Sequence, residues 1–128
     1  MVTQITSNIK VSVITNYEGI YYKEYQMLYA FSYQITIENL SSDVVQLQAR
    51  HWEIFDTLNH TETVDGEGVV GQTPIIAPGK KYVYSSGCML KGTIGAMNGF
   101  YTMANFSNNT FFKVQIPTFK LVVPFAIN

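Results

Sequence analysis

The clearest alternating pattern in the sequence is Tyr29-Ala30-Phe31-Ser32-Tyr33-Gln34-Ile35-Thr36-Ile37-Glu38. Aromatic residues and isoleucine fill every odd position, and small or polar residues fill every even position. The side chains of a β-strand point alternately to its two faces, so this period of two predicts a long central strand with one buried face.

The segments on either side of this strand continue the β pattern. Residues 9–15 alternate with Ile9, Val11 and Val13 on one face, and a polar and aromatic connection is expected over residues 16–27. After a turn at residues 39–43, Val45, Leu47 and Ala49 restart the alternation on odd positions, whereas Trp52 and Ile54 are even. We therefore expect a β-bulge near Arg50-His51 to reconcile the two phases.

The second half of the chain predicts more strands. Residues 80–86 place Tyr82 and Tyr84 together, and residues 95–103 carry a second set of alternating positions with two glycines, which indicate bulges or close approach of another backbone. Residues 112–123 alternate on both sides of Pro117. Because proline cannot donate to a β-ladder, Pro117 is expected at a strand end or on an edge strand.

These patterns predict one all-β domain spanning residues 1–128. Seven to nine short strands without a long helix favour a β-sandwich of two antiparallel sheets, with immunoglobulin-like topology preferred to a jelly roll on size and a closed barrel as the alternative. Trp52 resembles the buried tryptophan of such sandwiches, whereas Cys88 is the only cysteine, so their internal disulfide is absent.

Composition narrows the function classes. The net charge of −1 argues against a nucleic-acid-binding protein that works by neutralising phosphates. A single cysteine fits a reducing compartment, and no apolar run approaches membrane-spanning length. The N-terminus has no secretory signal pattern. We therefore expect a cytoplasmic protein with no nucleic-acid or membrane partner.

One stretch has the composition of a ligand site. Gly66-Glu67-Gly68-Val69-Val70-Gly71, called the glycine loop below, has the letters of a dinucleotide fingerprint, but Pro74, Pro78 and Gly79 prevent the helix that the fingerprint requires. Two interpretations remain: a tight turn that needs glycine backbone angles, or an anion site in which successive N–H groups converge. Lys80 and Lys81 follow closely and would supply positive charge.

The chain also resembles the ApaG family in six successive blocks. The blocks occur in the family order at residues 31–39, 50–56, 66–71 with 77–79, 84–88, 95–99 and 116–121. The resemblance implies an immunoglobulin-like or fibronectin-III-like sandwich. The sequence departs from the family pattern at two places: Met89 stands where many members have proline, and Gln72-Thr73 stands in place of an acidic residue and glutamine.

What the resemblance implies about function concerns binding rather than catalysis. Bacterial members are usually encoded beside a diadenosine tetraphosphate hydrolase and have been linked to divalent cation (cobalt or magnesium) handling, and eukaryotic members are fused to F-box and polymerase-interacting proteins as partner-binding modules. The family glycine motif has been proposed to bind pyrophosphate, and this motif is intact here. No established reaction or cofactor comes with the family.

Three other groups of residues are candidate sites. His51 and His60 are the only histidines and could bind a metal together with neighbouring carboxylates, but their spacing matches no metal motif. Ser85-Ser86-Gly87-Cys88 contains nucleophile types but no adjacent base in sequence. The third group is five closely spaced tyrosines, which fit either an exposed partner surface or sheet packing: Tyr17, Tyr21, Tyr22, Tyr25 and Tyr29.

The sequence thus predicts a noncatalytic binding module that engages a protein partner. The alternative is binding of pyrophosphate or a nucleotide polyphosphate at Gly66, Glu67, Gly68, Val69, Val70 and Gly71 with Lys80 or Lys81. A hydrolase or metal-dependent enzyme is the third hypothesis, without assigned catalytic residues or cofactor. Homodimerisation through a sheet edge or face is left open.

Overall fold

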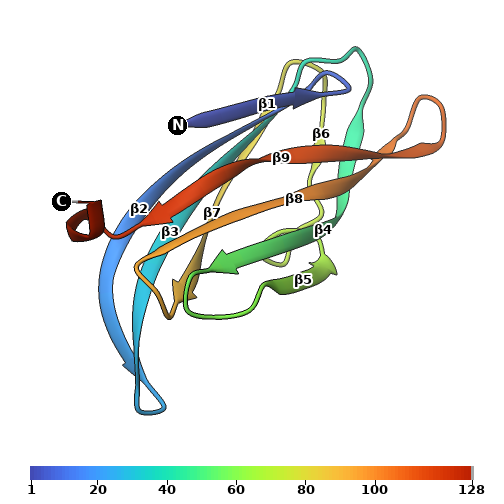
Figure 1. Ribbon diagram of the computed structural model, residues 1–128. Helices are drawn as coiled ribbons and strands as arrows, with labels where there is room; N and C mark the ends of the chain where they lie inside the picture. Colours follow the sequence, from blue (N-terminus) through green and yellow to red (C-terminus); the bar gives the residue numbers. More distant parts are fainter. Residues whose placement is uncertain (128) are drawn as a thin grey trace.

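The computed structural model describes residues 1–127, with side chains as far as Phe125. Within this range the chain forms nine β-strands and a 3-10 turn at its end (Figure 1). The strands are β1 (Val2–Thr6), β2 (Ile9–Lys23), β3 (Gln26–Asn39), β4 (Val45–Asp56), β5 (Glu62–Glu67), β6 (Ile75–Ile76), β7 (Lys81–Leu90), β8 (Ile94–Asn105) and β9 (Thr110–Val122), followed by η1 (Pro124–Ile127).

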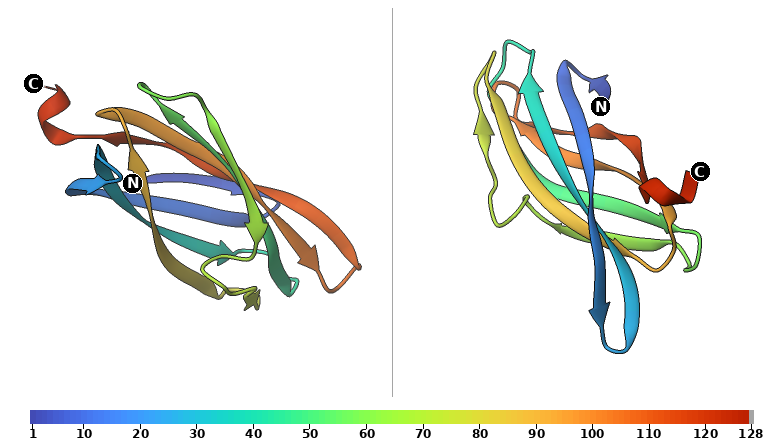
Figure 2. Two further views of the ribbon diagram at one scale, coloured as in Figure 1. Left: turned by 90° about the horizontal axis from the view of Figure 1, so that it is seen from below. Right: turned by 90° about the vertical axis from the view of Figure 1, so that its left-hand side faces the viewer.

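The strands form two antiparallel sheets packed face to face. The first sheet has the order β1-β2-β3-β7, and the second has the order β5-β4-β8-β9 with the short β6 also paired to β4. The strands of the two sheets cross obliquely (Figure 2). No strand pairing between the sheets occurs among residues 1–127, so the β-sandwich prediction is confirmed and the closed barrel is wrong.

The core lies between the sheets and follows the alternation in the sequence. Ile35 and Ile37 on β3 are completely buried, as their odd positions predict. Tyr33 packs against Trp52 on β4 and Phe119 on β9, with ring centroids 5.6 and 5.5 Å away. These aromatic side chains join the two sheets at the centre, where burial of large rings contributes most to the free energy of folding.

The expected connection over residues 16–27 is wrong. β2 and β3 continue through it as one long hairpin, in which Lys23 pairs with Gln26 around a two-residue turn. Glu24 and Tyr25 in this turn both have positive φ, 51° and 65°, as a type I′ turn requires. Polar residues in the segment suggested a loop, but isoleucine and tyrosine are strong strand formers, and the cross-strand pairs they make decide the structure.

The predicted irregularities are present but displaced. The register of β4 against β8 shifts between Leu47 and Ala49, so the bulge lies earlier than Arg50-His51. Arg50 and Trp52 consequently point inward. Pro117 lies within β9 rather than at its end, at a register shift against β8, and β9 is an edge strand as predicted.

Asn39 is the one buried polar side chain among the described residues and ties three segments together. Its Nδ2 donates to the carbonyls of Asp43 at 2.7 Å and Ile76 at 2.9 Å, while its Oδ1 accepts from the Ser41 amide at 3.0 Å. The end of β3, the following turn and β6 are therefore held by one side chain. No helix in residues 1–127 is long and apolar enough to cross a membrane.

Candidate functional site

The glycine loop is a β-hairpin turn that begins inside β5. Val69 and Gln72 exchange backbone hydrogen bonds of 2.8 and 2.9 Å. The two residues between them, Val70 and Gly71, have φ of 46° and 75°, which defines a type I′ turn. A β-branched residue rarely adopts positive φ, so Val70 holds a strained backbone.

Arg50 on β4 fixes this loop in place. Its Nη1 donates to the carbonyl oxygens of Glu67 and Gly68, both at 2.9 Å. Gly66 is the cross-strand neighbour of Arg50, and a β-carbon there would lie 2.7 Å from three guanidinium atoms. The guanidinium therefore lies flat over the Gly66 backbone, an approach that only glycine permits.

Most of the loop amides that were expected to bind an anion donate to backbone carbonyls of the chain instead. The amides of Gly68, Val69 and Gln72 donate to backbone carbonyls, which leaves those of Val70 and Gly71 without a backbone acceptor among residues 1–127. Lys81 pairs with Glu38 on β3 and is exposed on the face opposite to Tyr82. Neither Lys80 nor Lys81 lines the pocket beside the loop, so the lysines and the loop do not form one site around it.

That pocket, called the inter-sheet pocket, has a volume of about 200 Å³. It is lined by Tyr33, Arg50, Trp52, Val69, Val70, Tyr84 and Ser86. Burial raises the pKa of Tyr33 and of Tyr84, and hydrogen bonding to Ser86 and to Tyr101, respectively, only partly offsets this effect. Both hydroxyls therefore keep their protons at neutral pH. Sequence reasoning missed this pocket because Arg50 and the tyrosines meet only across two sheets.

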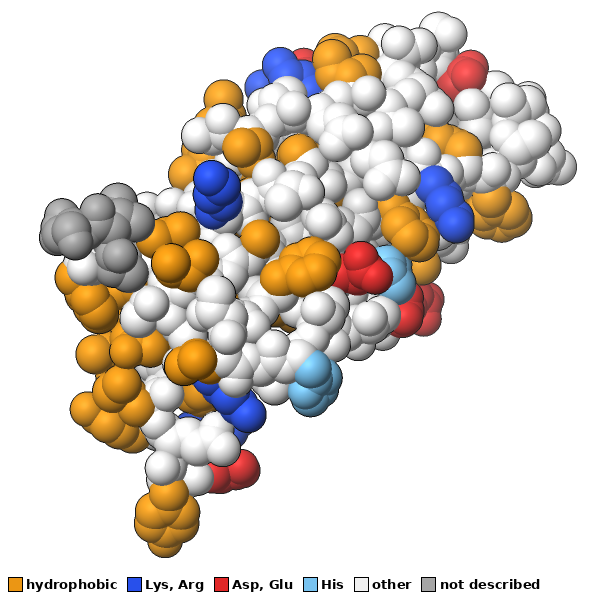
Figure 3. Space-filling model, in the orientation of Figure 1, with side chains coloured by type: hydrophobic (Ala, Val, Ile, Leu, Met, Phe, Trp, Pro, Cys, Tyr) orange, Lys and Arg blue, Asp and Glu red, His pale blue; other side chains and the backbone are white. Residues whose placement is uncertain are grey.

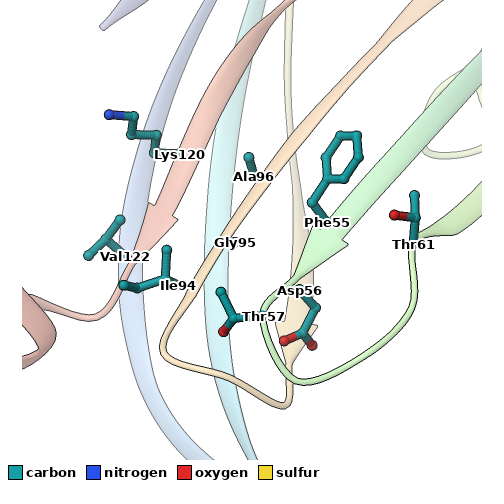
Figure 4. Close-up of a pocket in the computed structure, with 9 residues that line it drawn as sticks. All are labelled: Phe55, Asp56, Thr57, Thr61, Ile94, Gly95, Ala96, Lys120 and Val122. Atoms are coloured by element: carbon teal, nitrogen blue, oxygen red, sulfur yellow. The ribbon is translucent and has the colours of Figure 1, made fainter.

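A groove lies on the outer face of the second sheet (Figure 4). It measures about 560 Å³ and is formed where β4 ends, β8 begins and β9 ends. Its walls are mainly apolar, and its lining comprises Phe55, Asp56, Thr57, Thr61, Ile94, Gly95, Ala96, Lys120 and Val122. The sequence carried a signal for this outer groove, since Ile94 and Ala96 are apolar at positions that alternate with the core residue Met97.

The β2–β3 hairpin extends beyond the rest of the sandwich and carries exposed apolar side chains (Figures 1 and 3). Tyr21 and Tyr22 are 50% and 79% exposed, and Tyr25 at the turn is fully exposed. Tyr17 and Tyr29 of the same group instead pack inward against Phe31 and Phe125. The five tyrosines thus divide into the buried Tyr29, the partly buried Tyr17 that packs against the core, and three exposed residues.

The two histidines lie in different surroundings. His51 is on the outer face of β4, where Nδ1 is 2.6 Å from a carboxylate oxygen of Asp65 and the ring stacks on Phe100. His60 follows the turn after β4 and lines a separate pocket with Glu62. No group of three metal-ligating side chains occurs within residues 1–127, and the structure gives the histidine pair no shared site.

The serine and cysteine residues of β7 occupy opposite faces. Ser86 and Cys88 have the same inward phase as Tyr84, whereas Ser85 points outward. Burial raises the pKa of the Cys88 thiol to about 11, with smaller contributions from Glu62 and Asp56. The thiol is therefore protonated at neutral pH and is a poor nucleophile.

Comparison with known proteins gives consistent matches over most of the chain. The family model described as the ApaG domain matches residues 20–105. The chain is 44% identical over 122 residues to Protein ApaG of Shewanella sediminis, covering 95% of this chain and 96% of the relative. It is 40% identical over 124 residues to Protein ApaG of Brucella canis, covering 97% and 95%.

Solved structures agree with the sequence matches. An X-ray structure of a Northeast Structural Genomics Consortium target superimposes with a TM-score of 0.86 at 40% identity, covering 91% of this chain and 88% of the other. The crystal structure of the putative ApaA protein from Bordetella pertussis gives a TM-score of 0.82 at 39% identity, covering 91% and 94%. The matched family is described as a domain and not by a reaction.

Proposed function

The chain belongs to the ApaG family, and from this premise we propose that it is a noncatalytic binding domain that engages a protein partner through its β2–β3 hairpin. The observation that carries the proposal is the exposure of Tyr21, Tyr22 and Tyr25 at the end of that hairpin. Ile20 and Met27 add exposed apolar surface beside them, at 43% and 45%. We call residues 20–28 the hairpin tip.

The hairpin tip has no third strand to support it. β7 pairs with β3 only from Tyr29 onward, so the tip is a two-stranded ribbon. Such a ribbon is marginally stable in water by itself, and its exposed tyrosines do not contribute to the core. Tyrosine is enriched among the residues that dominate binding energy at protein interfaces, because it offers a large rigid surface with a polar end. A partner that covers the tip would stabilise it by burying this surface.

The outer groove lies close enough to extend the same surface. Asp56 lines the outer groove and also a pocket of about 190 Å³ to which Gln26 and Leu28 of the hairpin contribute. The Asp56 carboxylate accepts from the amides of Lys91 at 2.7 Å and Gly92 at 2.9 Å, which holds the β4–β5 and β7–β8 turns together. A partner bound at the hairpin tip could therefore continue along a preformed surface to the groove.

Photo-crosslinking tests this proposal. A benzophenone amino acid placed at Tyr22 should crosslink a specific protein in a native lysate, and Tyr25→Ser should abolish that crosslink. The matched control carries the probe at Phe111, a 72% exposed aromatic residue at the start of β9, and should not capture the same protein. Equal crosslinks from both positions, or none from position 22, would contradict hairpin binding.

Stability measurements separate a binding effect from unfolding. Because these tyrosines are exposed, the double variant Tyr22→Ser/Tyr25→Ser should change the free energy of unfolding by no more than about 0.5 kcal/mol. Loss of the crosslink with preserved stability therefore assigns the effect to the surface. A crosslinked second copy of this chain would identify homodimerisation as the interaction.

Pyrophosphate or a nucleotide polyphosphate is the second candidate ligand. The intact glycine motif and the two amides of Val70 and Gly71 that lack a backbone acceptor support it. Calorimetry with pyrophosphate, adenosine triphosphate and diadenosine tetraphosphate tests the idea, and Lys80→Ala and Lys81→Ala test whether either lysine takes part although neither lines the pocket beside the loop. Absence of heat at about millimolar ligand would count against any affinity of physiological use.

A further inference from the structure

Arg50 is a half-buried cation that the chain leaves without a counter-charge. The one contact between a basic and an acidic side chain among the described residues joins His51 to Asp65, and Arg50 contacts two carbonyl oxygens through Nη1 alone. A guanidinium carries five N–H donors, and its Nε and Nη2 edge matches the two oxygens of a carboxylate. This edge has no hydrogen-bond acceptor among the described residues, and it is not sealed from solvent, since no unpartnered side-chain nitrogen or oxygen is buried in the part of the chain that the structure describes. It is therefore open to a ligand that enters the pocket.

The other lining groups favour an anion. Of the seven residues around the inter-sheet pocket, none is acidic, and three carry hydroxyls: Tyr33, Tyr84 and Ser86. Tyr33 and Ser86 hydrogen-bond to each other, so this pair keeps one proton that can be donated to a ligand. The Tyr84 hydroxyl also bonds to that of Tyr101, which is completely buried. If the Tyr101 hydroxyl donates in this bond, Tyr101 has a hydrogen-bond partner and the proton of the Tyr84 hydroxyl remains available for a hydrogen bond to a ligand.

We propose that the inter-sheet pocket binds a small carboxylic acid, with its carboxylate on the Nε and Nη2 edge of Arg50 and the hydroxyls of Tyr84 and Ser86. The apolar walls formed by Trp52, Val69 and Val70 contact the short carbon part of the acid. This site differs from the phosphate site suggested by the glycine motif, because its cation is Arg50 and it lies beneath the loop. It is independent of the protein-binding proposal.

Size and charge select the ligand class. About 200 Å³ is smaller than the pockets of roughly 300–1,000 Å³ that hold drug-sized ligands, so a dinucleotide polyphosphate is too large for it. A phosphate dianion would keep an unneutralised charge in a half-buried pocket that contains one cation. A carboxylate is planar, carries a single charge and matches the guanidinium edge.

The glycine loop serves this pocket in two ways. Gly66 leaves the space that the Arg50 guanidinium occupies at the pocket, and Val69 and Val70 form part of the pocket wall. Gly66 is thus a positioning residue that acts through Arg50. The carbonyl oxygens of Glu67 and Gly68 in the loop accept hydrogen bonds from Arg50, and the side chains of Val69 and Val70 face the proposed ligand.

The fluorescence of Trp52 provides a direct assay, because it is the only tryptophan and it lines the pocket. The full chain is titrated at constant ionic strength with acetate, benzoate, inorganic phosphate and pyrophosphate. Acetate or benzoate should produce a saturable change. Arg50→Gln should raise the dissociation constant at least about tenfold, and Tyr84→Phe or Ser86→Ala about threefold each.

Control variants keep the test decisive. Lys113→Gln removes a positive charge that lies over Phe100 on the outer face of the same sheet and should leave the dissociation constant unchanged. If circular dichroism shows that Arg50→Gln is unfolded, Tyr84→Phe and Ser86→Ala decide the question. The proposal is overturned if neither carboxylate gives saturation up to about 50 mM. It is equally overturned if the folded pocket variants bind like the wild type, or if only pyrophosphate binds.

Discussion

The guanidinium of Arg50 lies directly over the backbone of Gly66, its cross-strand partner on β5, where a β-carbon would come within 2.7 Å of three guanidinium atoms. The guanidinium thus occupies the space that a side chain at Gly66 would take, although Gly66 does not lie at a turn. Its neighbour Arg50 uses the space to reach the carbonyls of Glu67 and Gly68.

Gly66→Ala should therefore reduce stability through Arg50. The added methyl displaces the guanidinium and breaks its two hydrogen bonds, which should lower the free energy of unfolding by about 1–2 kcal/mol. Urea denaturation measures the loss. In an Arg50→Ala background the same substitution should cost much less, because nothing remains to displace. Equal costs in both backgrounds would show that the two residues are not coupled.

Val70→Asn should stabilise the protein. Val70 holds φ of 46° in the type I′ turn, where asparagine is favoured and a β-branched residue is strained. We expect a gain of about 1 kcal/mol in the free energy of unfolding. Val83→Asn is the matched control, since Val83 is also an exposed valine but lies in the extended strand β7. A gain from Val83→Asn as large as that from Val70→Asn would contradict the turn explanation.

Asn39→Ala should be strongly destabilising. The substitution leaves the carbonyls of Asp43 and Ile76 without their side-chain donor at a site that is completely buried. The expected loss is about 2–4 kcal/mol, because several buried polar groups lose their partners together. Asn98→Ala removes an exposed hydrogen bond to Thr118 and should change stability by less than about 0.5 kcal/mol. Similar losses in denaturant titrations of the two variants would be unexpected.

Stability should fall above about pH 10 because of the buried tyrosines. Burial raises the pKa values of Tyr33, Tyr84 and Tyr101 above their usual value of 10.0. As pH rises past 10.0, the unfolded chain loses these protons first, so the folded state binds more protons and the free energy of unfolding declines. Below that value both states are protonated and the contribution is fully present.

The Tyr84→Phe variant isolates part of this effect. It should be less stable than the wild type at neutral pH, because Tyr101 loses its hydrogen-bond partner, and its stability should fall less steeply above about pH 10. Thermal melting of both proteins across the alkaline range gives the two slopes. Parallel slopes would mean that Tyr84 does not contribute to the alkaline transition.

Cys88 should react slowly with iodoacetamide in the folded protein. Its pKa is raised from 9.0 to about 11, so at about pH 8 the thiolate fraction is roughly 100-fold lower than in the unfolded chain. Mass spectrometry of alkylation in buffer and in urea measures the ratio. Equal rates in the two solutions would indicate that the thiol is not shielded as the structure implies.

The candidate sites could be predicted from the sequence only in part. The glycine loop was recognised from its spacing, and its interpretation as a turn is confirmed at Val70 and Gly71, but Lys80 and Lys81 do not join it at the inter-sheet pocket. Arg50 was not singled out, because nothing near it in sequence indicates that it faces Gly66. The tyrosine cluster was identified, although which of its members are exposed depends on where β7 stops pairing with β3.

The fold class, the central strand at residues 29–38 and the family could be predicted from the amino-acid sequence. These properties depend on alternation and residue order, which act locally because the position of a residue along its strand sets the face on which its side chain lies. The position of the β4 bulge, the division of the tyrosines and the pocket between Arg50, Trp52 and Tyr84 became visible in the tertiary structure. Those features depend on which strands pair and in what register, since residues distant in sequence meet only when two sheets pack together.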